Sequence, residues 1–409
     1  MPAFDAFPAT RYAPGSDLQN LLAPPYDVVS EAEVAELHAR DPHNITHIDV
    51  PGEPVAAVEG AIDDDAPADA DRYARAGRLL DEWIDDGVLV TDDVPALTIE
   101  RMTFTDATGR QRTISGVLGA LAVVDAGAGG VLPHERTTPK ASTDRLDLTR
   151  ATGANLSPVW GLSLASGLTA LLAEPGELIG EVELAGAVHR AERITDPERI
   201  AAISAVIASD DVLIADGHHR YGVARQYRDE VRAATGRDDT AAEATLAFVN
   251  ELIDEQLSIE AIHRIYSGVT AEALRAALGE RFTFEAAPEP SPALLAAMEE
   301  KSALVVMWPD GAQEWLIPKP GAFDDVRALD GAWLEAATAG LDGLATTYQH
   351  GLDEMVGIVA SGDVTAGVLI RPTSIEEIRR TAREGLLMPP KSTFFTPKLL
   401  TGWVVRKMS

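Results

Sequence analysis

The sequence predicts an α/β fold in which helices cover a mixed sheet. Short apolar runs typical of buried strands alternate with segments whose apolar residues recur at helical spacing. The chain has 409 residues, 46% of them hydrophobic, which allows two or three domains with substantial cores. In the stretch 212–227, VLIADGHHRYGVARQY, a buried strand leads directly into an acid, a glycine, two histidines and an arginine. We expect this junction to lie at one end of a cleft.

The composition argues against several classes of protein. The formal net charge is −31 and the few lysines form no basic block, which disfavours a nucleic-acid-binding surface. The absence of cysteine excludes disulfides, thiolate catalysis and cysteine-based metal sites. No apolar run is long enough to span a bilayer, and the first residues, MPAFDAFPATRYAPG, lack the basic and apolar parts of a secretion signal. A cytoplasmic enzyme or binding protein is therefore expected, and its oligomeric state is not indicated.

The first expected helix follows a loop that contains two prolines. The prolines favour an extended backbone, and Ser30 with Glu33 forms the capping box of a helix to about residue 40. Tyr26 and Asp27 lie in this loop, where they either bind substrate or only mark the start of the helix. A solvated loop at 52–70, a helix from 73 to 84, strands at 96–104 and 113–124, and a turn at 106–109 are expected to follow.

The stretch 132–158 gathers charged and polar residues with little apolar character. Glu135 is the candidate catalytic base here, and the candidate substrate-binding residues are His134, Asp144, Arg145 and Asn155. The residue three after Glu135 is a threonine, so the HExxH pattern of zinc proteases is absent. The competing interpretation is an exposed helix that is rich in salt bridges.

The remaining elements are expected to divide the chain into three parts. These are a core region, 1–266, a peripheral α/β subdomain, 267–345, and a C-terminal segment, 346–409, that returns to the core site. Strands are expected at 157–164, 181–190, 212–215, 244–250, 257–266, 282–285, 304–308, 314–317 and 365–370, and helices at 165–172, 200–208, from 221, 272–278, 292–301 and 375–383.

The strongest candidate site is the DGHHR turn. Gly217 would let the backbone turn tightly or approach a ligand, and the amides at the start of the next helix favour an anion. Arg220 could hold a phosphate or carboxylate through two parallel hydrogen bonds. The alternative is a surface turn whose histidines cap a helix.

Near the C-terminus, Lys391 and Ser392 lie in the loop MPPKSTFFTPK, where lysine and hydroxyl donors suit a phosphate. The alternative there is a plain surface loop.

Six motifs resemble the domain-of-unknown-function family 1015. They are APPYDVVS at 23–30, PHERT at 133–137, TDR at 143–145, ATGANLSP at 151–158, IADGHHRY at 214–221 and MPPKSTFFTPK at 388–398. The fifth motif is also similar to the glycine–x–x–arginine turn of the ParB and sulfiredoxin superfamily. Members of that superfamily include partition proteins, sulfiredoxins and kinases that phosphorylate free serine.

That second resemblance implies a strand–turn–helix element that holds nucleotide phosphates. Sulfiredoxin chemistry is excluded because there is no cysteine, and DNA partitioning is disfavoured by the charge and by the lack of a clear helix-turn-helix.

The expected function is a nucleotide-dependent phosphotransferase that acts on a small hydroxylated metabolite, for which free serine is one candidate. ATP or ADP with Mg²⁺ is the expected cofactor, and Asp216 is the expected magnesium ligand. One alternative is a nucleotide or phosphometabolite sensor without turnover, and another is a metal-dependent phosphoester hydrolase that uses His134, Asp216 and the two histidines of the turn. In the kinase interpretation Glu135, Asp216 and His218 are catalytic, and Gly217, His219, Arg220, Lys391 and Ser392 bind the phosphates.

Overall fold

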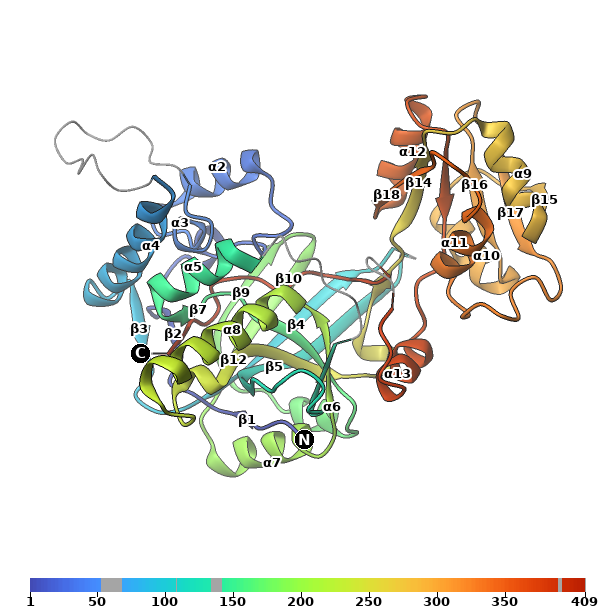
Figure 1. The fold of residues 1–409 in the computed structure, drawn as a ribbon. Coiled ribbons are helices and arrows are strands. Elements are labelled where there is room, and N and C mark those ends of the chain that lie inside the picture. Colours follow the sequence, from blue (N-terminus) through green and yellow to red (C-terminus); the bar gives the residue numbers. More distant parts are fainter. Residues whose placement is uncertain (53–67, 108, 134–141, 389–391, 409) are drawn as a thin grey trace. The chain divides into compact units, whose positions relative to one another are not determined.

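The computed structural model describes residues 1–52, 68–107, 109–133, 142–388 and 392–408 (Figure 1). Contacts between residues divide the chain into two compact units. The second unit starts before the expected 267–345 subdomain and extends well beyond it, because residues on both sides of that range pack in the sheet of this unit. Unit 1 comprises Met1–Phe104, Arg112–Gln256 and Pro397–Ser409, and unit 2 comprises Thr105–Gln111 and Leu257–Thr396.

Unit 1 contains a mixed sheet, which has nine strands in the described part of the chain and confirms the predicted fold class. Its strands are β1 (Phe4–Asp5), β4 (Leu97–Thr105), β5 (Gln111–Ala122), β6 (Val131–Pro133), β8 (Val159–Ser163), β9 (Glu177–Leu184), β10 (Ala187–Ile194), β11 (Val212–Asp216) and β12 (Ala244–Glu251). The order is β6-β11-β8-β12-β5-β4-β10-β9, with β1 beside β5. Strand β11 runs parallel to β6 and antiparallel to β8.

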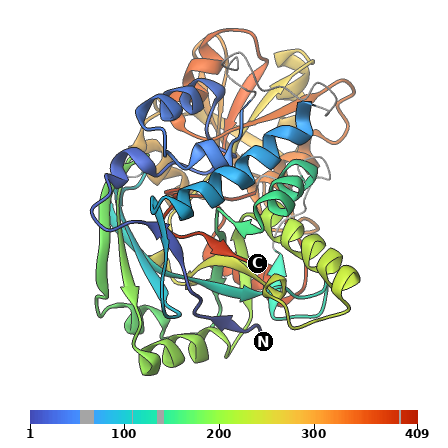
Figure 2. The same cartoon turned by 90° about the vertical axis from the view of Figure 1, so that its left-hand side faces the viewer.

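Helices and two small ladders complete unit 1. In both views α4, α5 and α8 follow one another along one side of the sheet (Figures 1 and 2). The helices are α1 (Leu18–Leu21), α2 (Glu31–Arg40), α3 (Thr46–Asp49), α4 (Ala68–Asp85), α5 (Ser142–Thr152), α6 (Leu168–Leu172), α7 (Pro197–Ile207) and α8 (His218–Thr235), and the ladders pair β2 (Thr10–Tyr12) with β3 (Leu89–Thr91) and β7 (Ala154–Asn155) with β21 (Arg406–Lys407).

Local sequence explains where these elements begin and end. The predicted capping box of α2 is confirmed, because Ser30 Oγ accepts from the Glu33 amide and the Ser30 amide donates to Glu33 Oε2 at 2.7 Å. Three consecutive residues of β11, Val212, Leu213 and Ile214, are buried, and Val212 and Ile214 belong to the hydrophobic core of unit 1. Burial of this strand fixes the place at which the polar residues after it emerge.

The expected single strand at 181–190 is wrong, because the chain forms a hairpin there. Strands β9 and β10 pair antiparallel around Ala185 and Gly186, whose φ values are 50° and 78°. Positive φ at both central residues is the geometry of a tight hairpin turn. The sequence ELAGAV conceals this turn because alanine rarely adopts positive φ.

Unit 2 contains a second sheet with helices on both faces. Its helices are α9 (Ala271–Arg281), α10 (Pro292–Lys301), α11 (Asp330–Thr338), α12 (Leu352–Ala360) and α13 (Ile375–Arg383). Its main strands are β14 (His263–Ser267), β15 (Phe282–Ala286), β16 (Leu304–Met307), β17 (Gln313–Pro318), β18 (Ala345–Gln349) and β19 (Ala366–Leu369), in the order β15-β17-β16-β19-β14-β18, and β13 (Ile259–Glu260) pairs separately with β20 (Phe394–Phe395).

Alternation along β16 produces two cores in unit 2. Leu304 and Val306 pack with α9 and α11, whereas Val305 and Met307 pack with α10 and α12. The expected strand at 257–266 is wrong as one element, because the chain forms β13 and then β14 with a break between them. Helix α11, strand β18 and helix α12 were not predicted from the sequence.

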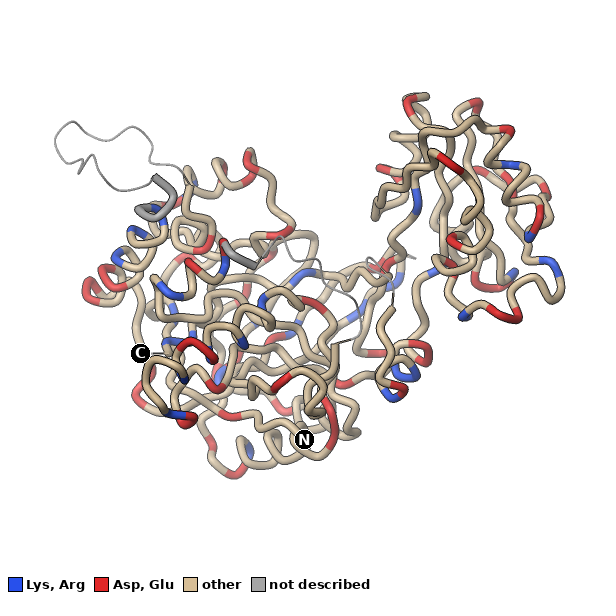
Figure 3. The backbone as a smooth tube through the Cα atoms, in the orientation of Figure 1, with Lys and Arg blue, Asp and Glu red and all other residues tan. Residues whose placement is uncertain are grey.

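Charged residues of both signs occur throughout the described part of the chain. Figure 3 shows acidic and basic positions interspersed along both units. Among the described helices, none combines the length and the hydropathy needed to cross a membrane.

Candidate functional site

The DGHHR motif forms a one-residue turn between β11 and α8. Gly217 adopts φ 81° and ψ 28°, the left-handed conformation that glycine favours, and His218 already begins the helix. The helix therefore starts three residues earlier than its expected start at residue 221. The N-cap residue Gly217 has no side chain to cap this start, and the backbone amides of the first turn of α8 give the site a positive end.

Asp216, the last residue of β11, is held by donors on both of its oxygens. Its Oδ1 accepts from the Gly217 amide at 2.7 Å, and its Oδ2 accepts from Lys398 Nζ at 2.8 Å. Burial alone would raise the pKa of this carboxyl, but Lys398 and Arg220 outweigh burial and hold the pKa well below its usual range. Asp216 is consequently ionised at neutral pH.

Arg220 lies one helical turn after Asp216 and is nearly buried, with 9% of its side chain exposed. Its Nη1 donates to the carbonyl of Pro158, and its Nη2 lies 3.5 Å from Asp27 Oδ2 and 3.8 Å from Asp216 Oδ2. Burial would lower the pKa of this guanidinium, but the Asp27 and Asp216 carboxylates raise it, so the charge is retained. Among the described residues no acceptor reaches the buried Nε of Arg220.

Two arginines approach the ring of Tyr26. The guanidinium carbon of Arg145 lies 3.9 Å from the ring centroid, and that of Arg220 lies 5.9 Å from it. In such contacts the negative face of the aromatic ring attracts the positively charged guanidinium. Burial raises the pKa of the Tyr26 hydroxyl, which stays neutral. The loop with two prolines thus brings Tyr26 and Asp27 to the DGHHR turn.

Several of these side chains line a small cavity of about 50 Å³. Of the predicted site residues, Tyr26, Arg145, Asn155 and Arg220 line it. Further lining residues that the sequence analysis did not identify include Asp49 and Ser157, which come from α3 and from the loop before β8. A cavity of this size holds a group such as phosphate or carboxylate and is far smaller than a typical ligand pocket of roughly 300–1,000 Å³.

Asp49 is the principal residue that the sequence analysis missed. It is 2% exposed, and Arg145 Nη1 donates to its backbone oxygen at 2.7 Å and to its Oδ1 at 3.1 Å. Ser157 Oγ donates to Asp49 Oδ2 at 3.3 Å. Burial raises the pKa of Asp49, and Arg145 opposes that effect. The motif THIDVP gave no local signal, because its partners are about one hundred residues away in the chain.

Asp144 and Asn155 both bind other parts of unit 1. Asp144 accepts from Tyr73, from Arg72 at 3.0 Å and from Arg145 Nε at 3.1 Å. Burial would raise the pKa of Asp144, but the hydrogen bond from Tyr73 and the two arginines lower it. Asn155 Oδ1 accepts from the Leu246 amide at 3.1 Å, so this residue ties β7 to β12. Their roles in substrate binding stay predictions.

The other predicted residues fall into two groups. His218 and His219 lie in the first turn of α8, while Ser392 belongs to unit 2, where its carbonyl accepts from Thr373 at 3.0 Å. Their site roles stay predictions. Three further candidates lie outside the described residues: His134, Glu135 and Lys391.

The side chains around Asp216 can be compared with the ligands that the expected magnesium ion would require. Asp216 offers one carboxylate, and a donor already binds each of its oxygens. Among the described residues no group of three His, Asp or Glu side chains could hold a metal ion. The described side chains therefore do not fit a magnesium site of their own.

Comparison with known proteins finds one family. The family described as "Protein of unknown function (DUF1015)" matches residues 4–332, so Lys398 lies beyond the matched part. No curated protein matches significantly. Among solved structures, SbnI with a C-terminal truncation from Staphylococcus aureus is 14% identical, with a TM-score of 0.39 over 70% of this chain and 86% of that chain.

Two further structures resemble the chain to a similar extent. A free serine kinase in complex with AMP is 13% identical, with a TM-score of 0.36 over 65% of this chain and 84% of that chain. A conserved hypothetical protein from Pyrococcus furiosus is 11% identical, with a TM-score of 0.36 over 68% of this chain and 92% of that chain. At these scores, site roles have to be derived from the residues of this chain.

Proposed function

The chain belongs to the DUF1015 family, whose description gives no function. From the site of this chain we propose a nucleotide-dependent phosphotransferase that acts on a small hydroxylated metabolite, with free serine as one candidate acceptor. The single observation that carries this proposal is the cluster of Asp216, Arg220 and Lys398 at the uncapped start of α8. The resemblance of the DGHHR turn to phosphate-holding turns agrees with it.

Arg220 has the capacity to bind a phosphate. Its distances to Asp27 and Asp216, 3.5 and 3.8 Å, exceed the roughly 2.7–2.9 Å of a strong charge-assisted hydrogen bond. A phosphate oxygen at the helix start would give the guanidinium a closer anion and would also meet the backbone amides there. Phosphoryl transfer depends mainly on such positioning and charge neutralisation.

Asp216 is better suited to organise the site than to accept a proton. A carboxylate whose pKa is held low by Lys398 and Arg220 is a weak base at neutral pH. We assign Asp216 the task of orienting the Lys398 ammonium and the Gly217 amide. Glu135 remains the proposed base that takes the proton of the attacking hydroxyl. Bound Mg²⁺ would supply charge neutralisation at the phosphates, and no step here depends on a protein magnesium site.

The activity is tested by incubating the purified full chain with ATP or ADP, Mg²⁺ and a panel of small hydroxylated metabolites that includes L-serine. Transfer is followed by mass spectrometry of the acceptor. Loss of one charged contact to the transition state costs roughly a hundred- to a thousandfold in rate, so Arg220→Ala is expected to lower turnover on that scale. Arg237→Ala is the matched control, because Arg237 is exposed and pairs only locally with Asp239.

The outcomes separate the proposal from its alternatives. Nucleotide binding without transfer to any acceptor would favour the sensor. Hydrolysis that requires added metal but no acceptor would favour the phosphoester hydrolase. Equal turnover of Arg220→Ala and the parent protein would remove the DGHHR turn from the chemistry.

A further inference from the structure

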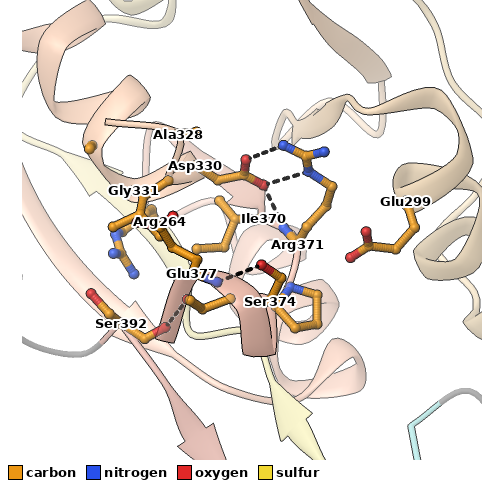
Figure 4. A pocket seen from close by; sticks show the side chains of 14 residues that line it. Arg264, Glu299, Ala328, Asp330, Gly331, Ile370, Arg371, Ser374, Glu377 and Ser392 are labelled. Carbon is orange, nitrogen blue, oxygen red and sulfur yellow. Dashed lines mark hydrogen bonds and ion pairs between the residues drawn. The ribbon is translucent and has the colours of Figure 1, made fainter. Parts of the chain in front are cut away.

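Two cavities in the described part of the chain differ in how the polar groups of their walls are bound. Unit 2 has a cavity of about 150 Å³, in whose wall Asp330 accepts from the Arg371 amide at 2.8 Å, from its Nε at 3.0 Å and from its Nη2 at 2.6 Å (Figure 4). The cavity of about 50 Å³ beside Arg220 in unit 1 is lined instead by three side chains that each keep a donor without an acceptor among the described residues. These three donors define what the smaller cavity can bind.

Arg145 contributes the first donor. Its Nε donates to Asp144 Oδ2 at 3.1 Å, and its Nη1 donates to the backbone oxygen of Asp49 at 2.7 Å and to Asp49 Oδ1 at 3.1 Å. The Tyr26 ring, whose centroid lies 3.9 Å from the guanidinium carbon, holds the side chain from another side. Within the described residues no acceptor binds Nη2, and this atom is not enclosed by the protein. Nη2 is thus held in place and ready to donate to a ligand.

Asn155 contributes the second donor. Its Oδ1 accepts from the Leu246 amide at 3.1 Å and from Arg406 Nη1 at 3.2 Å, and these two donors fix the orientation of the side-chain amide. Its Nδ2 has no acceptor in the described part of the chain and is not enclosed by the protein. Because both lone pairs of Oδ1 are in use, Asn155 can only donate to a ligand in the cavity.

Thr245 contributes the third donor, from β12. The residue is 3% exposed and lines the cavity. Its hydroxyl makes no hydrogen bond with any described residue, and its oxygen is not enclosed by the protein. Since so little of Thr245 reaches the outer surface, the accessible part of this hydroxyl faces the cavity.

The charge of the wall narrows the choice of ligand. The charged side chains among the described lining residues are Arg145, Arg220 and Asp49, which leave one positive charge in excess. Both oxygens of Asp49 already accept, Oδ1 from Arg145 and Oδ2 from Ser157 at 3.3 Å. The wall therefore favours an anionic group over an ammonium group. Free donors with one excess positive charge suit a single carboxylate.

We propose that the phosphoryl acceptor is a small hydroxy acid whose carboxylate binds in this cavity. The carboxylate oxygens accept from Arg145 Nη2, Asn155 Nδ2 and Thr245 Oγ1. A short hydroxy acid keeps its carboxylate and its hydroxyl only a few bonds apart, so the hydroxyl lies near Arg220, which also lines the cavity. This inference rests on the proposed phosphotransferase, in which Arg220 binds the phosphates, and it adds that the acceptor carries a carboxylate and needs no amino group.

The carboxylate takes no part in the bonds that change. The acceptor hydroxyl oxygen forms a bond to the terminal phosphorus of the nucleotide, and the bond from that phosphorus to its bridging oxygen breaks. The hydroxyl proton goes to Glu135, the base in the proposed function. The nucleotide leaves one phosphate shorter and keeps the electron pair of the broken bond.

Four matched compounds test the assignment on the full chain. L-serine is compared with β-hydroxypropionate, which lacks the amino group, with ethanolamine, which lacks the carboxylate, and with β-hydroxypropionamide, in which a neutral amide replaces the carboxylate. Calorimetry is expected to show that the two carboxylates bind about tenfold or more tightly than the other two compounds. With ATP or ADP and Mg²⁺ present, the rate of phosphoryl transfer is expected to follow the same order.

Asn155→Asp tests the cavity with little change in shape. The new carboxylate still accepts from Leu246 and Arg406, but it replaces the Nδ2 donor with a negative charge. Binding of β-hydroxypropionate is expected to weaken about tenfold or more. Asn20→Asp is the matched control, because the amide there donates to Asp17 Oδ2 on the protein surface and binding should not change.

Thr245→Val separates a ligand contact from a structural role. The Thr245 hydroxyl has no partner among the described residues, so the variant is expected to keep the melting temperature of the parent and to bind β-hydroxypropionate severalfold more weakly. Thr152→Val is the control with the opposite pattern. Its Oγ1 donates to the Leu148 carbonyl at 2.8 Å, so its loss should lower the melting temperature and leave binding unchanged.

The outcomes distinguish this inference from the activity on which it rests. Transfer to ethanolamine as fast as to L-serine would overturn the carboxylate site and leave the phosphotransferase standing. Equal binding of the acids and the amide, or equal binding by Asn155→Asp and the parent, would overturn the site as well. Selective binding of the two acids without transfer to any of the four compounds would support the carboxylate site and overturn the transfer.

Discussion

At the scale of single residues, the ion pair between Asp216 and Lys398 organises the candidate site. The sequence identified Asp216, because an acid directly after a buried strand is unusual. It did not identify Lys398 as the partner, because the two residues are 182 positions apart and nothing local links them. The same limitation concealed Asp49, whose partners Arg145 and Ser157 are also distant in the chain.

Removal of the ammonium group should destabilise unit 1. Lys398→Met leaves the ionised Asp216 with fewer donors in a partly buried place, where 25% of its side chain is exposed. Loss of one partner of such a group costs about 1–3 kcal/mol. Urea unfolding followed by circular dichroism measures this free energy.

Lys407→Met provides the matched control. Its ion pair with Asp81 is 2.9 Å long, close to the 2.8 Å of the Asp216 pair, but the Asp81 side chain is 67% exposed. Exposed pairs contribute about 0–1 kcal/mol. Equal destabilisation by the two variants would show that the Asp216–Lys398 pair contributes no more to the free energy of unfolding than an exposed ion pair.

At the scale of elements, the sequence predicted those with strong local signals. Ser30 and Glu33 located the start of α2, where the Ser30 side chain caps the helix in the structure. The helix predicted at 375–383 has the bounds of α13. The hairpin of β9 and β10 was missed because an alanine occupies its left-handed position. The sheet order and the cavity beside Arg220 depend on pairings between distant segments, which periodicity does not encode.

The turn between β11 and α8 depends on Gly217. Gly217→Ala places a Cβ atom in a backbone conformation that costs about 1–2 kcal/mol for an L-residue. That atom would also lie 3.1 Å from Arg220 Nε, so the guanidinium would have to move. We expect loss of stability by about this amount and weaker phosphate or nucleotide binding, measured by thermal unfolding and calorimetry.

Gly222→Ala in the same helix is the control for this change. Nothing lies within 4 Å of a Cβ atom at Gly222, and alanine is a better helix former than glycine by about 1 kcal/mol. The control should therefore be neutral or stabilising. A Gly217→Ala protein as stable as the parent would contradict the strained turn.

At the scale of the whole molecule, the excess of acidic residues governs the response to salt. Asp and Glu number 65 against 34 Lys and Arg, and the two kinds are interspersed over both units (Figure 3). Net repulsion destabilises a compact chain and is screened by added salt.

We therefore expect the melting temperature to rise from low salt to molar NaCl, at roughly 2–4 °C for each kcal/mol gained. Differential scanning calorimetry across this range measures the change. A melting temperature that falls with added NaCl would mean that attractive ion pairs outweigh the net repulsion.

The return of residues 397–409 to unit 1 has a consequence for synthesis of the protein. On the ribosome, the strand, the turn and Arg220 are made long before Lys398, and the whole continuous part of unit 2 is translated in between. Domains generally fold in the order in which they emerge. A nascent chain can thus form the DGHHR turn early, but Asp216 gains its ammonium partner only after the continuous part of unit 2 has been translated. Completion of this site therefore reports that the continuous part of unit 2 has already been made.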